Sequence, residues 1–169
     1  MKDALEHLSL ETVDKVTSAV VDTSSIIFAK KAGFLLPLTR AVTLTAPPGV
    51  IKELQGEVAP ELGLGNIDTM PEATDLYDGY AVDAQVVVTA LRRRQPVVSD
   101  DYKLLQRAAD QGIDGFTVRT MLELTLLRGK IDLKDYTRCK RALSGLIRYA
   151  MPLFLAAEEL HWEIRKQIG

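Results

Sequence analysis

The sequence has a single cysteine, Cys139, and two histidines, His7 and His161. One thiol cannot form an internal disulfide, so the fold does not depend on one. The two histidines lie near opposite ends of the chain, and neither follows an expected strand. We therefore expect neither thiol nor histidine chemistry, and the lone thiol suits a reducing compartment.

Long apolar runs and a large charge of one sign are also absent. No stretch approaches the roughly 20 uninterrupted apolar residues that span a bilayer, and the N-terminus has no apolar core of signal-peptide length. These absences predict a cytoplasmic protein with no membrane partner. The formal net charge is −2, whereas tight binders of duplex nucleic acid usually present a dense cationic face. Brief contact between an enzyme and a nucleic acid remains compatible with this charge.

The chain has 169 residues, of which 47% are hydrophobic, enough for one compact domain with a core. Strand-like segments alternate with helical ones, which predicts an α/β fold with three layers and a parallel sheet of about five strands. We divide the chain into a domain at 1–130, with a short lead-in, and a C-terminal helical extension at 131–169. The predicted strands are 17–22, 41–46, 66–70, 96–99 and 115–118. The predicted helices are 26–38 (broken at Gly33, closed by Pro37), a short one from Val50, 81–94, 102–111, one from an N-cap at Thr120 to Arg128, and 132–168 (interrupted at Pro152).

Acids follow two of the predicted strands at the point where each strand ends. Val97-Val98-Ser99-Asp100-Asp101 is one such segment, and Val20-Val21-Asp22-Thr23-Ser24 is the other. In parallel α/β sheets, ligands bind at the carboxyl ends of the strands. Each acid alone also fits a plainer role: Asp22 and Asp100 or Asp101 as helix N-caps, Glu53 as a solvated side chain, and Asp83 as a first-turn helix acid.

Taken together, Asp22, Glu53, Asp83 and Asp101 are predicted to face one crevice. Carboxylates that crowd together repel one another unless a cation neutralises them. Oxygen ligands of this kind select a hard cation, Mg²⁺ or Mn²⁺. Such an ion can activate water and stabilise the charge on a phosphodiester.

The same segments resemble the PIN-domain family of metal-dependent ribonucleases, whose order and spacing are kept from about residue 17 to 130. The resemblance implies that Asp22, Glu53, Asp83 and Asp101 are the metal-binding and catalytic acids and that Ser99 supports the site through a hydrogen bond. Asp100 occupies a position that varies in the family, and we rank it as a substitute for Asp101. It also implies an endoribonuclease that acts on RNA, with single-stranded RNA the expected substrate. Many PIN-type nucleases are toxins held by a small antitoxin, so a protein inhibitor is a further expectation. The resembling pieces are Ala19-Val20-Val21-Asp22-Thr23-Ser24, Pro48-Gly49-Val50-Ile51-Lys52-Glu53-Leu54, Asp83-Ala84-Gln85-Val86-Val87-Val88 and Val98-Ser99-Asp100-Asp101-Tyr102-Lys103-Leu104-Leu105.

Two other functions compete with the nuclease. One is a catalytically inactive PIN-like module that binds protein or RNA, since a fold alone does not define an activity. The other is a different metal-using α/β phosphohydrolase. The haloacid-dehalogenase type needs a second aspartate two residues after Asp22. Ser24 stands at that position, which argues against this type.

The apolar residues of 132–168 recur at helical spacing and are expected to pack on the chain's own domain, with a homodimer or partner protein as the alternative. Several basic residues are candidate phosphate contacts, although a solvated surface is the simpler interpretation for each. They are Lys30, Lys31, Lys52, Arg92, Arg93, Arg94, Lys103 and Arg107.

Overall fold

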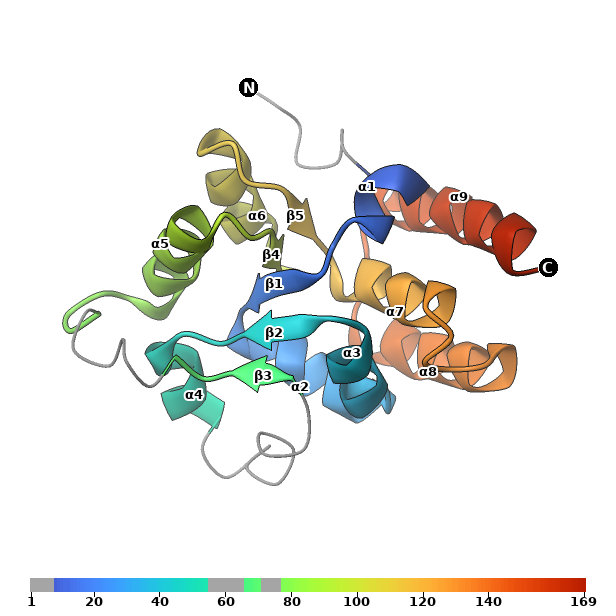
Figure 1. Cartoon of the computed structure of the whole chain (residues 1–169), viewed down its shortest axis with the longest axis horizontal. Coiled ribbons are helices and arrows are strands. Elements are labelled where there is room, and N and C mark those ends of the chain that lie inside the picture. Colours follow the sequence, from blue (N-terminus) through green and yellow to red (C-terminus); the bar gives the residue numbers. More distant parts are fainter. Residues whose placement is uncertain (1–7, 55–65, 71–76) are drawn as a thin grey trace.

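The computed structural model describes residues 8–54, 66–70 and 77–169. Within them, five parallel strands form one sheet in the order β3-β2-β1-β4-β5 (Figure 1). The strands lie inside the five segments predicted from the sequence and alternate with helices, so the predicted α/β class is confirmed. His7 and the first half of the expected lead-in lie outside the described residues. The strands are β1 (Ser18–Val21), β2 (Thr43–Thr45), β3 (Ile67–Asp68), β4 (Val97–Val98) and β5 (Gly115–Phe116).

The central strand β1 pairs with β2 on one side and with β4 on the other. The valines of β1 and β4 are almost completely buried, as is typical of parallel strands covered on both faces. Val21 of β1 is paired with Val98 of β4. Because the two strands are parallel, the residues that follow them, Asp22 and Ser99, leave the sheet at the same edge.

Helices cover both faces of this sheet (Figure 1). α5 (Val82–Arg93) contacts β1 and β4, and α6 (Tyr102–Asp110) contacts β4 and β5. α2 (Thr23–Ala32), α3 (Leu35–Ala41) and α7 (Val118–Leu127) pack against one another on the other face. α4 (Pro48–Leu54) contacts both α2 and α5, and this contact connects the two helical layers at one edge of the sheet.

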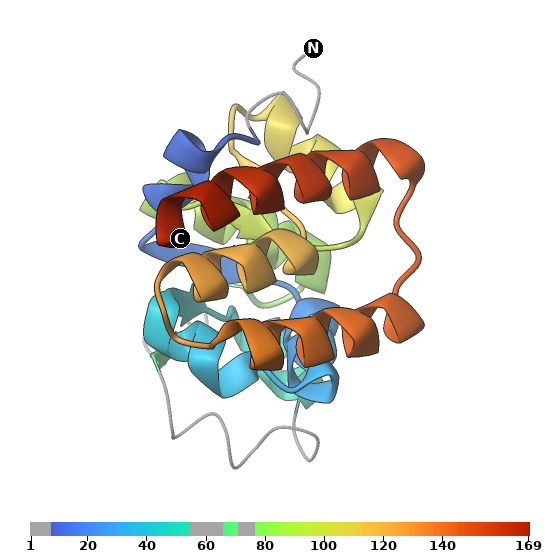
Figure 2. The same ribbon diagram turned by 90° about the vertical axis from the view of Figure 1, so that its right-hand side faces the viewer.

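The C-terminal helices extend the second layer. α7 lies between α8 (Leu133–Leu146) and α9 (Met151–Ile168), as Figure 2 shows, and α8 also contacts α2. The short α1 (Leu10–Asp14) contacts α7 and α9. The helical break comes at 147–150 rather than at Pro152, which lies in the first turn of α9. A proline is tolerated there because the first N–H groups of a helix have no intrahelical partner.

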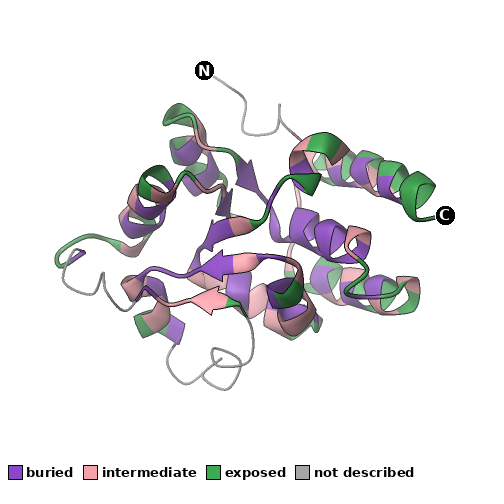
Figure 3. Cartoon of the chain, viewed as in Figure 1, coloured by how far each residue is buried: buried purple, intermediate pink, exposed green. Residues whose placement is uncertain are grey.

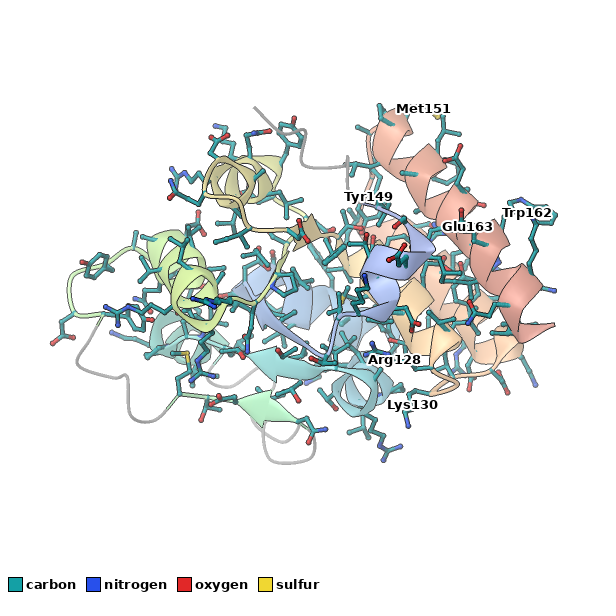
Figure 4. All side chains as sticks on the ribbon, turned by 45° about the horizontal axis from the view of Figure 1, so that its top comes forward. Arg128, Lys130, Tyr149, Met151, Trp162 and Glu163 are labelled. Atoms are coloured by element: carbon teal, nitrogen blue, oxygen red, sulfur yellow. The ribbon has the colours of Figure 1, made fainter. Side chains whose placement is uncertain are left out.

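Burial divides α9 into two sides (Figure 3). Leu160 and Ile164 are buried against the neighbouring helices, whereas Met151 and Trp162 are exposed. Figure 4 shows Trp162 pointing away from the body of the molecule. In the part of the chain that the structure describes, no helix has the length and apolar character needed to cross a membrane.

Two predicted helix boundaries are wrong, and one predicted break is confirmed. The chain breaks at Gly33, whose φ of 91° lies in the left-handed region that glycine adopts without strain. Pro37 does not close a helix; it lies in the first turn of α3, which continues to Ala41. The N-cap of α7 is Thr117 and not Thr120, because the Thr117 side chain accepts the N–H of Thr120.

Candidate acidic site at the carboxyl edge of the sheet

Asp22 is the buried centre of the acidic site. It follows β1 and caps α2, and its Oδ1 accepts the backbone N–H of Ser25 at 2.9 Å and the hydroxyl of Ser24 at 3.3 Å. Its Oδ2 accepts a hydrogen bond from the hydroxyl of Ser99, at the end of β4. Residues of α2 and the end of β4 therefore hold the Asp22 side chain in place. The same carboxylate caps α2 and belongs to the candidate site.

Asp101 lies beside it at the end of β4. The carboxylate caps α6 by accepting the N–H groups of Lys103 at 2.9 Å and Leu104 at 3.4 Å. Its own backbone N–H donates to Oγ of Ser99 at 3.0 Å. Ser99 thus joins Asp22 to Asp101, which is the supporting hydrogen bond that the resemblance implied for it. The Asp101 side chain is exposed, whereas Ser99 is fully buried.

Glu53 comes to the same edge from α4. Thr23, the first residue of α2, donates its hydroxyl hydrogen bond to Oε2 of Glu53. This contact joins the last turn of α4 to the first turn of α2, immediately after Asp22. No local pattern in the sequence marks Thr23 as a candidate site residue, since its partner is 30 positions away.

Asp83 completes the group from the first turn of α5. Partial desolvation of its carboxyl and the negative charges of Asp101 and Asp22 raise the pKa of Asp83 above its ordinary value. The charge of Glu53 acts in the same direction, and the guanidinium of Arg107 opposes it. Asp22, Glu53 and Asp101 therefore each lie close enough to act on Asp83.

Three helices begin where these acids meet. Asp22 and Asp101 are the N-caps of α2 and α6, and Asp83 lies in the first turn of α5. The positive ends of the helix dipoles offset part of the mutual repulsion of the carboxylates. Among the described residues, no three acidic, histidine or cysteine side chains are arranged closely enough to hold a metal ion as they stand. The donors nevertheless fit Mg²⁺ or Mn²⁺ in type, because all are carboxylate or hydroxyl oxygens.

Asp100 has partners of a different kind from those of Asp101. Its Oδ1 accepts the backbone N–H of Val118 at 3.1 Å and the hydroxyl of Tyr149 at 3.0 Å. Burial raises the pKa of Asp100 to about 6, against the effect of both hydrogen bonds. Asp100 therefore connects the end of β4 to the segment between α8 and α9, which does not support its interpretation as a substitute for Asp101.

An open cleft of about 1000 Å³ adjoins Glu53. Lys52 also lines this cleft, so a positively charged side chain lies there together with Glu53, a candidate metal ligand. Among the other predicted phosphate contacts, Lys103 lies in the first turn of α6, which Asp101 caps, and Arg107 acts on Asp83. The remaining ones lie at the C-terminal ends of α2 and α5, whereas the candidate acids lie at the N-terminal ends of these helices. They are Lys30, Lys31, Arg92, Arg93 and Arg94.

A second polar cluster joins α7, α8 and α9 away from this edge. Glu123 is fully buried and receives the Arg119 guanidinium at 3.0 Å and the hydroxyl of Tyr136. Nδ1 of His161 lies 2.8 Å from the other carboxylate oxygen of Glu123, and the His161 ring stacks on Tyr136 at 4.8 Å. Arg119 also pairs with Glu158 of α9 at 2.9 Å. These contacts hold the helical layer together.

The fold and site define an α/β protein with a parallel sheet and an acidic carboxyl edge. No protein-family model, no curated protein and no solved structure matches this chain.

Proposed function

We propose that the chain is a metal-dependent endoribonuclease that hydrolyses phosphodiester bonds in RNA. The observation that supports this most is the convergence of Asp22, Glu53, Asp83 and Asp101, from four different elements, at one edge of the sheet. Their charges act together on the pKa of Asp83, and a cation is what such a group requires to be neutralised. The resemblance of the same four segments to the PIN-domain family favours the same activity, in the cytoplasm.

In this proposal, one of the four acids is held in place and the other three have side chains that can move. Asp22 is buried and fixed by Ser25 and Ser99, so it is the anchor of the ligand set. Asp101, Asp83 and Glu53 are exposed, and their side chains can turn toward a cation that Asp22 holds. A bound Mg²⁺ or Mn²⁺ would lower the pKa of a water molecule and stabilise charge on the phosphodiester. Lys103 and Arg107 add positive charge on the side of α6 where the RNA backbone would approach.

The test is cleavage of end-labelled single-stranded RNA in Mg²⁺ and in Mn²⁺, with EDTA controls. Asp22→Asn and Asp101→Asn should each abolish cleavage. Asp110→Asn is the matched control, because Asp110 is an exposed acid at the far end of α6 that bonds to Gln106, one turn earlier in the same helix. We expect this variant to cleave RNA at the wild-type rate. Equal cleavage by the wild type and both site variants would refute the site, and cleavage that persists in EDTA would refute the role of the metal.

A thermal-shift titration with each metal tests the ligand set independently of any substrate. A cation that binds only the folded chain adds about 2.7 kcal/mol to the free energy of unfolding at 100 times its dissociation constant. We expect the melting temperature to rise with Mg²⁺ or Mn²⁺ in the wild type and in Asp110→Asn, but not in Asp22→Asn. If the wild type neither cleaves RNA nor responds to metal, the inactive PIN-like module becomes the better description.

A further inference from the structure

We propose that the cleft beside Glu53 binds an unpaired nucleobase of the RNA strand, stacked on the ring of Tyr80. This inference rests on the proposed function, since it places one base of the substrate next to the acids. The cleft is formed by α4, the end of β3, the turn at 77–80 and the start of α5. Its described lining residues include Pro48, Gly49, Ile51, Lys52, Glu53 and Tyr80.

Tyr80 is an exposed aromatic side chain on a fixed support. The residue is 55% exposed, yet its N–H donates to the carbonyl of Tyr77 at 3.0 Å and its own carbonyl accepts from Nε2 of Gln85 at 3.0 Å. The rings of Tyr77 and Tyr80 meet edge to face, with centroids 6.4 Å apart and an angle of 86°. The two hydrogen bonds fix the backbone of Tyr80 and the edge-to-face contact supports its ring, which reduces the conformational entropy lost on binding.

The support of Tyr80 is itself anchored in the body of the molecule. Tyr77 is buried, and its hydroxyl lies 2.8 Å from Oγ1 of Thr89 on α5. Gln85 accepts the N–H of Gly49 at 2.8 Å while it donates to Tyr80, so one amide side chain joins both walls of the cleft. A Cβ at Gly49 would come within 2.8 Å of Oε1 of Gln85, so a larger residue here would have to displace this amide.

The residues that line the cleft indicate which kind of ligand it would bind. An exposed aromatic face binds any planar base by stacking. Each stacked base adds to the affinity for single-stranded nucleic acid, whatever its sequence. Lys52 supplies a cation for a phosphate beside that base. Glu53, on the same rim, is bonded to Thr23 next to Asp22, so a strand seated here continues over the acids. A base in a duplex has both faces covered by its neighbours and cannot stack on Tyr80.

The experiment measures the affinity of a short fluorescent single-stranded RNA in Mg²⁺, with Asp101→Asn as the background so that no cleavage occurs. Tyr80→Leu should weaken binding by about 5- to 150-fold, the range expected for one lost stacked base. Tyr80→Phe keeps the ring and should bind within about 2-fold of the background protein. Trp162→Leu removes another exposed ring, on the distant α9, and should have no effect. Thermal melts of each variant check that the fold is retained.

A panel of RNAs with an abasic site at successive positions identifies the base in the cleft. One abasic position should weaken binding to the protein with Tyr80 and have no further effect on the Tyr80→Leu variant. Equal affinities of Tyr80→Leu and its background, with both folded, would overturn the inference, as would RNA binding too weak to detect. RNA that is bound through Tyr80 but never cleaved by the wild type would support the cleft and refute the nuclease. RNA that is cleaved with no dependence on Tyr80 would refute the cleft alone.

Discussion

Ser99 donates a hydrogen bond from its hydroxyl to Oδ2 of Asp22, and this bond joins the ends of β4 and β1. The same hydroxyl oxygen accepts the backbone N–H of Asp101 at 3.0 Å. One small side chain, fully buried, therefore sets the positions of two candidate metal ligands. A serine fits here because a hydroxyl donates and accepts at once.

Ser99→Ala should destabilise the protein by about 1 to 3 kcal/mol, because the buried carboxylate of Asp22 loses a donor. The measurement is urea unfolding at neutral pH without added metal. Ser144→Ala is the control: the Ser144 hydroxyl bonds only to the carbonyl of Lys140 within α8 and is exposed. That variant should lie within about 0.5 kcal/mol of the wild type. Equal effects of the two substitutions would show that the Ser99 hydroxyl has no special importance.

Gly49→Ala should destabilise the protein by about 1 to 3 kcal/mol, the usual range for overpacking. The added methyl group meets the amide of Gln85 and displaces it from both Gly49 and Tyr80. Gly145→Ala is the opposite case, because Gly145 lies in α8 with no atom within 4 Å of a new Cβ. It should stabilise the protein by roughly 0.5 to 1 kcal/mol through helix propensity. Thermal unfolding of the two variants should give shifts of opposite sign, and shifts of the same sign would contradict the packing at Gly49.

The strands and the strand-end positions of Asp22 and Ser99 were predictable because their signals are local. Val20-Val21-Asp22 and Val97-Val98-Ser99 each place a buried run directly before a polar residue, and parallel pairing then brings the two ends to one edge. The contacts that orient the acids are not local. The bond between Thr23 and Glu53 depends on how α4 packs on α2, which no pattern in either segment records.

One misassigned N-cap and one choice between neighbouring acids show the same limit. Thr117 and Thr120 are both suitable N-caps, and they belong to one capping contact, so the composition of the segment could not separate them. Asp100 and Asp101 are adjacent acids at a strand end. What distinguishes their surroundings is Tyr149, which bonds to Asp100 and lies 49 positions away from it.

Glu158 should make the stability of the helical layer depend on pH. Desolvation raises its pKa, but the bonds from Lys140 and Arg119 outweigh this and hold the pKa below its ordinary value. A carboxyl whose pKa is lower in the folded state stabilises the fold above its unfolded pKa of about 4.5. That stabilisation is lost as the pH falls through the lower, folded value.

Glu158→Gln should therefore lower the free energy of unfolding by about 1 kcal/mol at pH 7, a figure reduced for solvent screening because the side chain is about a third exposed. At a pH below the folded pKa of Glu158, where the carboxyl is protonated, the difference should largely vanish. The measurement is urea unfolding of both proteins between pH 7 and pH 2.5. A constant difference across this range would mean that the charge of Glu158 is unimportant.

Tyr149 connects the C-terminal helices to the strand that carries the site. Its hydroxyl donates to Oδ1 of Asp100 at 3.0 Å and accepts the N–H of Arg119 at 3.3 Å. Tyr149→Phe should cost about 1 to 2 kcal/mol, because Asp100 then loses one of its two donors. In an Asp100→Ala background the same substitution should cost less, since the acceptor is already gone. Urea unfolding of the four proteins completes a double-mutant cycle, for which we expect a coupling of at least about 0.5 kcal/mol between residues in one hydrogen-bonded network. Additive effects would mean that α8 and α9 stabilise the protein without acting on the end of β4.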